Sequence, residues 1–390
     1  MTTANLLGTS PLPRFFAVDD VAGEPLPAPG AGWGHTVRAT VRSLSMMQKE
    51  AVVSSSASSR SWRLVSDEGD YLDGYDEAPP PLAFLSTGMV ASYMDELLAL
   101  AAMRGIDTKG IRLTLDNYYT MQGSALRGTM VAGADHPVLT AECPALAGNR
   151  SEAMSLLLGA TGASPMHGLV STSRSGSFAL IHNGERIAQG EVGGQDDAVE
   201  PDSDARFEQL CPAPGAWEAL LERGGPTPRT GEADSGPGSS LAETQDRRLH
   251  VRAVCTLRGD GLKEIQQSMF NPQGTMFRFL SDPDGQRAPG ASAYVAAGIG
   301  FCFMTQLGRY AKITRRDLER YAIVQDIDFS QGGATGDTGH AGDASAPRTT
   351  VSIASSEDAD FARQLLKMGE QTCFLHALCR TALKTRIRLA

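Results

Sequence analysis

Two cysteines in the last third of the chain carry the side chains best suited to covalent chemistry. Cys302 lies midway along the apolar stretch GIGFCFMTQLGRYAK, and Cys373 opens the stretch CFLHALC. A thiolate is a strong nucleophile, and a second thiol can close a disulfide with it after oxidation. A cysteine in an apolar helix is more often a packed structural residue, so the surrounding sequence must decide between these two interpretations.

The stretch CFLHALC offers a second chemistry. Cys373, His376 and Cys379 follow one another at three-residue spacing, close to one side of a helix turn. A cysteine beside a histidine can act as nucleophile and general base in a hydrolase or lyase. The same side chains could bind a soft metal, but their spacing rotates round the helix and no supporting carboxylate is visible, so we expect no metal and no cofactor. A histidine packed in the core also fits this pattern.

Length and composition indicate a globular protein of more than one domain. The chain has 390 residues, of which 41% are hydrophobic and 21% charged, and its net charge is −10. Such an acidic balance argues against nucleic acid or an anionic membrane as a partner. No apolar run reaches the roughly 18 residues that span a bilayer. The six scattered cysteines suit reduced thiols, so we expect a cytoplasmic protein.

Hydrophobic patterning predicts two buried central helices, at 82–104 and 291–312, because both runs are apolar almost all round. Strands are predicted at 35–53, 61–66, 111–120, 128–142, 177–187, 248–256, 276–281, 317–329 (after a helical turn), 349–354 and 385–389. Other helices are expected at 151–158, after Pro165, at 216–222 and at 358–383. Composition divides the chain into an irregular arm (1–34), a module (35–190), an acidic Pro/Gly-rich linker (191–247) and a second module (248–390).

The two modules repeat each other. SWRLVSDEG (61–69) matches MFRFLSDPDG (276–285), which places Arg63 opposite Arg278. In both modules a proline and then a buried helix follow this match. Duplication of one β-rich, two-helix unit is the economical explanation.

Aligning the two central helices places Ser92 opposite Cys302. Ser164 then falls opposite Cys373, because 72 residues separate the two serines and 71 separate the two cysteines. The thiols are therefore present together in the second module and absent together from the first. This coupled pattern indicates that the two cysteines share a task.

Three features of the repeat resemble the OsmC/Ohr superfamily. They are the Asp-rich turn DEGDYLDGYDEAPPP before the first central helix, the Cys302-Phe303-Met304 element, and SPMHGL at 164–169, which looks like the family's CPxS element with serine for cysteine. The resemblance covers most of both modules. It implies an α+β fold in which two fused modules form an intramolecular pseudo-dimer, each an antiparallel sheet packed on a buried central helix. The chain would then act as a monomer or assemble further as a homo-oligomer.

In the peroxidase members of that family, a cysteine on the central helix is oxidised by a hydroperoxide and a second cysteine resolves it as a disulfide. The resemblance implies that Cys302 attacks and Cys373 resolves. A thiolate needs a nearby cation, and Arg278 is the candidate, with Arg63 able to reach across from the other module. Regeneration would require a dithiol reductant.

The resemblance and the repeat also bear on substrate contacts. Phe301, His376 and Arg63 are expected to line the binding site of a small-molecule substrate. Family peroxidases commonly carry a glutamate in the turns before the central cysteine, where this chain has Ser292 and Ala293. The chain therefore departs from the family at the position expected to orient the arginine.

These observations predict thiol-dependent reduction of organic hydroperoxides in the second module. Serine cannot support this redox cycle, so the first module is expected to hold a degenerate site. Two alternatives stay open. One is a cysteine-dependent hydrolase or lyase acting on a thioester or activated carbonyl, and the other is a small-molecule binding module without catalysis.

Overall fold

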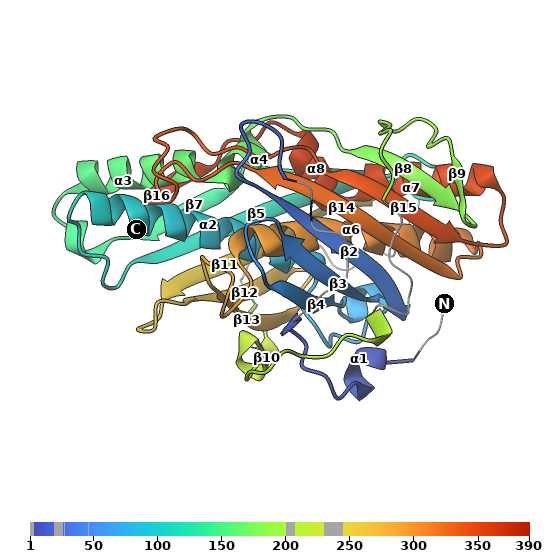
Figure 1. The fold of residues 1–390 in the computed structure, drawn as a ribbon, viewed down its shortest axis with the longest axis horizontal. Coiled ribbons are helices and arrows are strands. Elements are labelled where there is room, and N and C mark those ends of the chain that lie inside the picture. Colours follow the sequence, from blue (N-terminus) through green and yellow to red (C-terminus); the bar gives the residue numbers. More distant parts are fainter. Residues whose placement is uncertain (1–3, 19–25, 27, 46, 200–206, 230–244) are drawn as a thin grey trace.

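The structure is a computed structural model that describes residues 4–18, 26, 28–45, 47–199, 207–229 and 245–390. The described part is α+β, with two eight-stranded sheets and two long helices between them (Figure 1). The expected arm and linker both include residues that lie outside the described ranges.

The first sheet has the strand order β1-β4-β3-β2-β14-β15-β8-β9. Its strands are β1 (Phe16–Val18), β2 (His35–Ser45), β3 (Gln48–Ser55), β4 (Ser61–Ser66), β8 (Ser177–His182), β9 (Glu185–Ile187), β14 (Arg320–Phe329) and β15 (Arg348–Ala354).

The second sheet has the order β10-β13-β12-β11-β5-β7-β16, with β6 paired to β5. Its strands are β5 (Arg112–Gly123), β6 (Val131–Ala134), β7 (Val138–Glu142), β10 (Leu221–Pro226), β11 (Gln245–Leu257), β12 (Lys263–Asn271), β13 (Thr275–Ser281) and β16 (Arg386–Leu389).

Each sheet combines strands from both halves of the chain. β2 pairs antiparallel with β14, and β11 pairs antiparallel with β5, so blue and orange strands lie side by side in Figure 1, as do gold and cyan ones. Each sheet also holds one parallel pair, β15 with β8 and β16 with β7. The expectation of one antiparallel sheet per module is therefore corrected: the sheets are mixed and shared, because the strands cross between halves.

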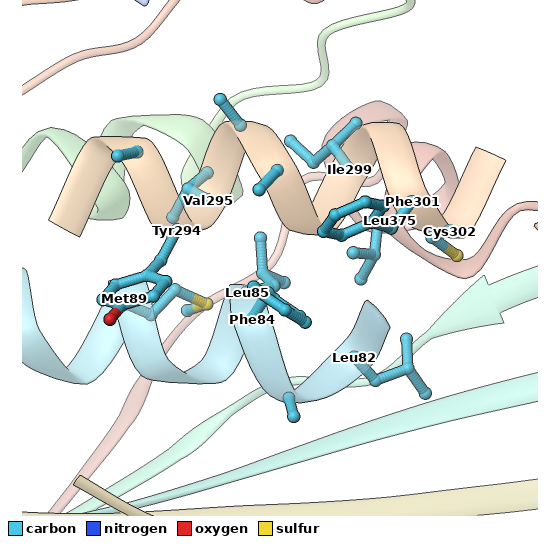
Figure 2. Packing of buried hydrophobic residues seen from close by; sticks show 14 of the residues in the cluster. Leu82, Phe84, Leu85, Met89, Tyr294, Val295, Ile299, Phe301, Cys302 and Leu375 are labelled. Atoms are coloured by element: carbon cyan, nitrogen blue, oxygen red, sulfur yellow. The ribbon is translucent and has the colours of Figure 1, made fainter. Parts of the chain in front are cut away.

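The two central helices are α2 (Pro81–Met103) and α6 (Ala291–Thr314). Pro81 at the first helical position of α2 suits a residue without a backbone N–H. The helices pack directly on each other, and each covers a different sheet: α6 packs on β2, β3 and β14, and α2 packs on β5, β11 and β12. Figure 2 shows Phe84 and Leu85 of α2 facing α6.

Two glycines allow this close helix contact. A Cβ at Gly88 would lie 2.5 Å from the carbonyl oxygen of Ala291, and a Cβ at Gly298 would lie 2.9 Å from the backbone nitrogen of Leu85. Gly88 lies four residues before Ser92, and Gly298 lies four residues before Cys302. The aligned positions therefore play the same packing role in both helices.

The helix α6 is also long and apolar enough to cross a membrane, with a mean hydropathy of 1.2 over its best window. In the fold, 89% of that window is buried. Its apolar surface therefore belongs to the core between the two sheets.

The remaining helices are shorter. They are α1 (Leu6–Thr9), α3 (Arg150–Ala163), α4 (Pro165–Ser171), α7 (Ala359–Thr372) and α8 (Phe374–Arg380), with 3-10 turns at Asp70–Leu72, Pro144–Leu146 and Glu218–Leu220. α3 packs on α2, and α7 packs on α6.

Parts of the segments expected as arm and linker pack on the sheets. β1, from the arm, pairs with β4, and β10, from the expected linker, pairs with β13. The ring of Trp217 meets that of Trp62 edge to face at 5.6 Å. Phe15 and Phe16 of the arm are also buried, so aromatic side chains in both segments add to the core.

Candidate functional site

Cys302 and Cys373 meet in the core of the second half. Cys302 lies on α6 and is 2% exposed, and Cys373 is fully buried where α7 ends and α8 begins. Cys373 has extended backbone angles (φ −75°, ψ 117°), so the single helix expected over 358–383 is broken at this residue. Both cysteines are free thiols, and they share a side-chain hydrogen bond.

The start of α8 donates a backbone N–H to each thiol. The N–H of Leu375 donates to Cys302, and the N–H of His376 donates to Cys373 Sγ at 3.5 Å. Figure 2 shows Leu375 beside Cys302 at the end of the packed cluster. The break in the helix at Cys373 therefore directs two backbone N–H groups toward the two sulfur atoms.

Burial strongly affects the charge of these thiols. Burial, and after it the hydrogen bond with Cys373, raise the pKa of the Cys302 thiol well above its ordinary value. Burial likewise raises the pKa of Cys379 to about 12. A thiolate at Cys302 therefore requires a compensating cation close by.

Lys49, from the first half of the chain, brings a buried ammonium near Cys302. It is the second residue of β3, which lies in the sheet under α6, and its side chain is fully buried. Its ammonium donates to the carbonyl of Met47 at 2.6 Å. Burial lowers the pKa of Lys49 to about 8, while the charges of Glu68, Asp67 and Cys302 act in the opposite direction. Lys49 and Cys302 are therefore close enough for a charge on one to affect the other.

Glu68 brings a carboxylate to the same place. It follows β4 in the Asp-rich turn, and its Oε2 accepts a hydrogen bond of 2.8 Å from the hydroxyl of Tyr71. Thr305, one turn along α6 from Cys302, donates to Oε1 at 3.5 Å. Burial raises the pKa of Glu68 to about 7, and Lys49 partly offsets that shift. A buried carboxyl group from the first half thus lies beside the helix that carries Cys302.

The two arginines matched by the repeat occupy corresponding places away from the thiols. Arg63 is buried on β4, where two guanidinium nitrogens donate to Glu50 Oε2 at 3.0 and 2.8 Å. Arg278 is partly exposed on β13 and pairs with Glu264 at 2.7 Å and with Glu222. The hydrogen bonds and ion pairs of both guanidiniums go to these carboxylates and to backbone carbonyls, so the structure brings neither arginine to Cys302.

His376 and Phe301 are both buried, but only His376 contacts a thiol. His376 Nδ1 lies 3.2 Å from Cys373 Sγ, and its ring packs against Phe178 and Phe303. Burial lowers the pKa of His376 to about 4. Phe301 faces the other way, with its ring 5.1 Å from that of Phe84 between the two helices. His376 thus contacts the site, and Phe301 belongs to the helix interface.

The first half repeats this geometry with hydroxyls. Ser92 Oγ and Ser164 Oγ lie 2.7 Å apart, and Ser164 Oγ accepts from the backbone N–H of Met166 at 3.2 Å. The buried ammonium of Lys263 pairs with Asp95, one turn along α2 from Ser92. Each site therefore has a buried lysine and a carboxylate. In the serine site the carboxylate is the partly buried Asp95 on α2, and in the thiol site it is the buried Glu68 in the turn after β4.

A cavity opens beside the serine site. A cavity of about 750 Å³ reaches Ser92, Asp95 and Met166 in the serine site. Neither Cys302 nor Cys373 lines it. Across the described ranges, no cluster of three or more His, Cys, Asp or Glu side chains is arranged to hold a metal.

Sequence reasoning missed Lys49 and Glu68, although a signal for the lysine was present. Both halves carry a Lys-Glu pair ahead of the matched arginine strand, QKEAVV at 48–53 and LKEIQQ at 262–267. In both halves the lysine pairs across the sheet with the serine of the matched Ser-Asp, Lys49 with Ser66 and Lys263 with Ser281. Extending the repeat by this one strand would have placed a cation in each site.

Comparisons with known protein families, with curated proteins and with solved structures gave no match.

Proposed function

We propose that this chain is an OsmC-like protein whose two modules form a pseudo-dimer, and that it reduces organic hydroperoxides at Cys302 and Cys373. The observation that carries the proposal is the contact between these two buried thiols, with Lys49 beside them. A peroxide cycle needs a thiol that can ionise and a second thiol within reach of its oxidised form. The shared strands support the pseudo-dimer, because each site takes side chains from both halves.

Lys49 would be the cation beside the thiolate, the role predicted for Arg278 from the sequence. Its buried ammonium favours the thiolate of Cys302 over the thiol. Glu68 holds that lysine by charge, and at a pKa of about 7 it can exchange a proton near neutrality. The cation and the carboxylate of the proposed site therefore both come from the half that lacks the thiols.

The proposed reaction has two steps. The Cys302 thiolate attacks the terminal oxygen of the hydroperoxide, the O–O bond breaks, and the alkoxide takes up a proton and leaves as the alcohol. Sulfur loses two electrons and becomes a sulfenic acid, and the peroxide gains them. The Cys373 thiol then attacks this sulfur, forms the disulfide and releases water. A dithiol reductant returns both cysteines to the thiol form.

The test is consumption of tert-butyl hydroperoxide by the whole chain in the presence of dithiothreitol. Cys302→Ser should abolish turnover, and Cys373→Ser should leave a sulfenic acid on Cys302 that dimedone traps. Cys255→Ser is the matched control, since Cys255 is a buried thiol near the opposite lysine, and it should keep activity. Failure of the unmodified protein to consume hydroperoxide with any dithiol would rule out the proposal.

One contact supports a second candidate function. His376 Nδ1 lies within reach of Cys373 Sγ at 3.2 Å, which suits a cysteine-dependent hydrolase or lyase acting on a thioester or activated carbonyl. This mechanism predicts an acyl adduct on Cys373 or Cys302 without any change in thiol oxidation. Intact mass measurement after exposure to a short-chain thioester separates it from the peroxide cycle.

A further inference from the structure

The turn that leads into the first central helix is longer than its counterpart in the second half. Asp67 lies 14 residues before the start of α2 at Pro81, whereas the matched Asp282 lies 9 residues before the start of α6 at Ala291. From these starts, the same number of residues leads to the aligned serine and cysteine. The turn of the first half is therefore five residues longer.

The repeat shows which part of the thiol site corresponds to the cavity in the serine site. That cavity is lined by the turn before α6, by the β3–β4 hairpin and by α2. Four of its lining residues are Pro283 in the turn, Ser55 and Arg60 in the hairpin, and Asp95 on α2. Their counterparts, counted from the matched lysines, arginine strands and central helices, are in the same order Glu68, Met269, Thr275 and Thr305.

Tyr71, in the longer turn, lies between two of these counterparts. Its hydroxyl donates to Glu68 Oε2 at 2.8 Å and lies 3.6 Å from Met269 Sδ. Burial, and after it the charge of Glu68, raises the pKa of Tyr71 well above its ordinary value, so this side chain stays neutral and keeps its proton. Tyr71 therefore spans the gap that corresponds to the cavity beside the serines.

Residues 69–75 form a loop whose two ends meet. The N–H of Asp76 donates to the carbonyl of Glu68 at 3.0 Å, which closes the base of the loop. The carboxylate of Asp67 strengthens that base, because it accepts from three backbone N–H groups of the turn at 2.8 to 3.2 Å. Compact surface loops with their ends close together are frequently functional. The base can therefore stay in place while the loop above it moves.

The outer side of the loop faces solvent. Asp70, Asp73 and Tyr75 are exposed, and Asp73 pairs with the exposed Lys312 at 2.7 Å. Exposed ion pairs contribute little to stability. Opening the loop would therefore cost chiefly the burial of Tyr71 and its hydrogen bond to the carboxylate.

We propose that residues 69–75 form a lid over Cys302 and Cys373, that Tyr71 holds this lid closed, and that its opening lets a hydroperoxide reach the sulfur through a gap equivalent to the cavity beside Ser92. Cys302 is 2% exposed and Cys373 is fully buried, so a substrate reaches either sulfur only after some segment moves. The purpose of the lid rests on the proposed peroxide reaction, but its movement can be measured without that reaction.

Alkylation of Cys302 by iodoacetamide at neutral pH, followed by mass mapping, measures opening of the lid in the whole chain. Tyr71→Ala should raise the rate by about tenfold or more, because it removes both the buried ring and the hydrogen bond that hold the lid closed. Tyr71→Phe keeps the ring and should raise the rate less. Tyr75→Ala is the matched control, since Tyr75 is an exposed tyrosine of the same loop, and it should react like the unmodified protein.

Three results would overturn the lid. The first is the same alkylation rate in Tyr71→Ala as in the unmodified protein. The second is an equal rise in Tyr71→Phe and Tyr71→Ala, because loss of the hydroxyl beside Glu68 would then explain the effect without any opening. The third is a parallel rise in the labelling of Cys255, a buried thiol near Lys263 in the serine site, because the whole fold would then be opening.

The same variants separate the lid from the proposed function. Faster labelling of Cys302 in Tyr71→Ala, in a protein that consumes no hydroperoxide, would support the lid and reject the peroxide reaction. Turnover of hydroperoxide with unchanged labelling in Tyr71→Ala would support the reaction and reject the lid.

Discussion

Ser92 and Ser164 share a hydrogen bond, Oγ to Oγ at 2.7 Å, at the positions that align with Cys302 and Cys373. Two side chains this close place their β-carbons within reach of disulfide geometry. The serine pair therefore preserves the arrangement of the thiol pair without its chemistry.

The first prediction converts this serine pair to thiols. In a chain that also carries Cys302→Ser and Cys373→Ser, the double change Ser92→Cys and Ser164→Cys should form a new disulfide on mild oxidation. Non-reducing peptide mapping would show the cross-link, which the single Ser92→Cys variant should lack. Two free thiols after oxidation would mean that the two sites differ in backbone geometry.

The second prediction concerns Lys49. Lys49→Met should slow the alkylation of Cys302 by iodoacetamide at neutral pH by about tenfold or more, because losing the ammonium raises the pKa of the thiol by at least about one unit. Mass mapping of the Cys302 peptide over time measures the rate. Lys263→Met, the corresponding change in the serine site, should leave that rate unchanged. Equal rates in all three proteins would show that Lys49 does not act on the thiol.

The third prediction is a pH dependence carried by His376. Burial lowers the pKa of His376 from 6.5 to about 4, so the unfolded chain binds this proton more readily than the folded one. The stability it contributes is fully present above pH 6.5 and is lost as the pH falls toward 4. The loss amounts to about 3 kcal/mol.

Denaturant unfolding between pH 4 and 7 measures this contribution. His376→Gln should show a shallower fall in the free energy of unfolding over that range than the unmodified chain. His340→Gln, a change in the exposed part of the 331–346 loop, should follow the unmodified curve. A parallel fall in all three would assign the acid sensitivity to other groups.

The fourth prediction concerns the contact between the central helices. Gly88→Ala should destabilise the fold by about 1–3 kcal/mol or more, because its Cβ would lie 2.5 Å from Ala291 O and 2.6 Å from Val295 Cγ2. Gly162→Ala on α3 meets nothing within 4 Å, so it should be neutral or slightly stabilising. Thermal unfolding of the two variants would show opposite signs, and a neutral Gly88→Ala would mean that the helices can separate easily.

Much of the secondary structure was predictable because its patterns are local. The helices expected at 82–104 and 291–312 match α2 and α6 within two residues at each end, and the strand at 61–66 is β4. β12 was missed because its buried face carries Lys263 and Gln267 beside Ile265 and Met269. Buried polar side chains break the alternation on which a strand prediction depends.

The pairing of the strands was harder to predict from the sequence than the strands themselves. Hydrophobic alternation shows which face of a strand is buried, but it does not show which strand lies beside it. No local sequence pattern therefore indicates that β2 pairs with β14 or that β11 pairs with β5. For the same reason the sequence could not show that the lysine and the carboxylate beside Cys302 would be Lys49 and Glu68, from the first half.

The shared strands also change the kinetic order of assembly. Two separate chains exchanging strands in this way would have to meet, and their stability would rise with concentration. Here both partners are covalently joined, so folding is unimolecular and the melting temperature of the monomer should be independent of dilution. The covalent link thus gives each half a fixed effective concentration of the other, which does not fall when the protein is diluted.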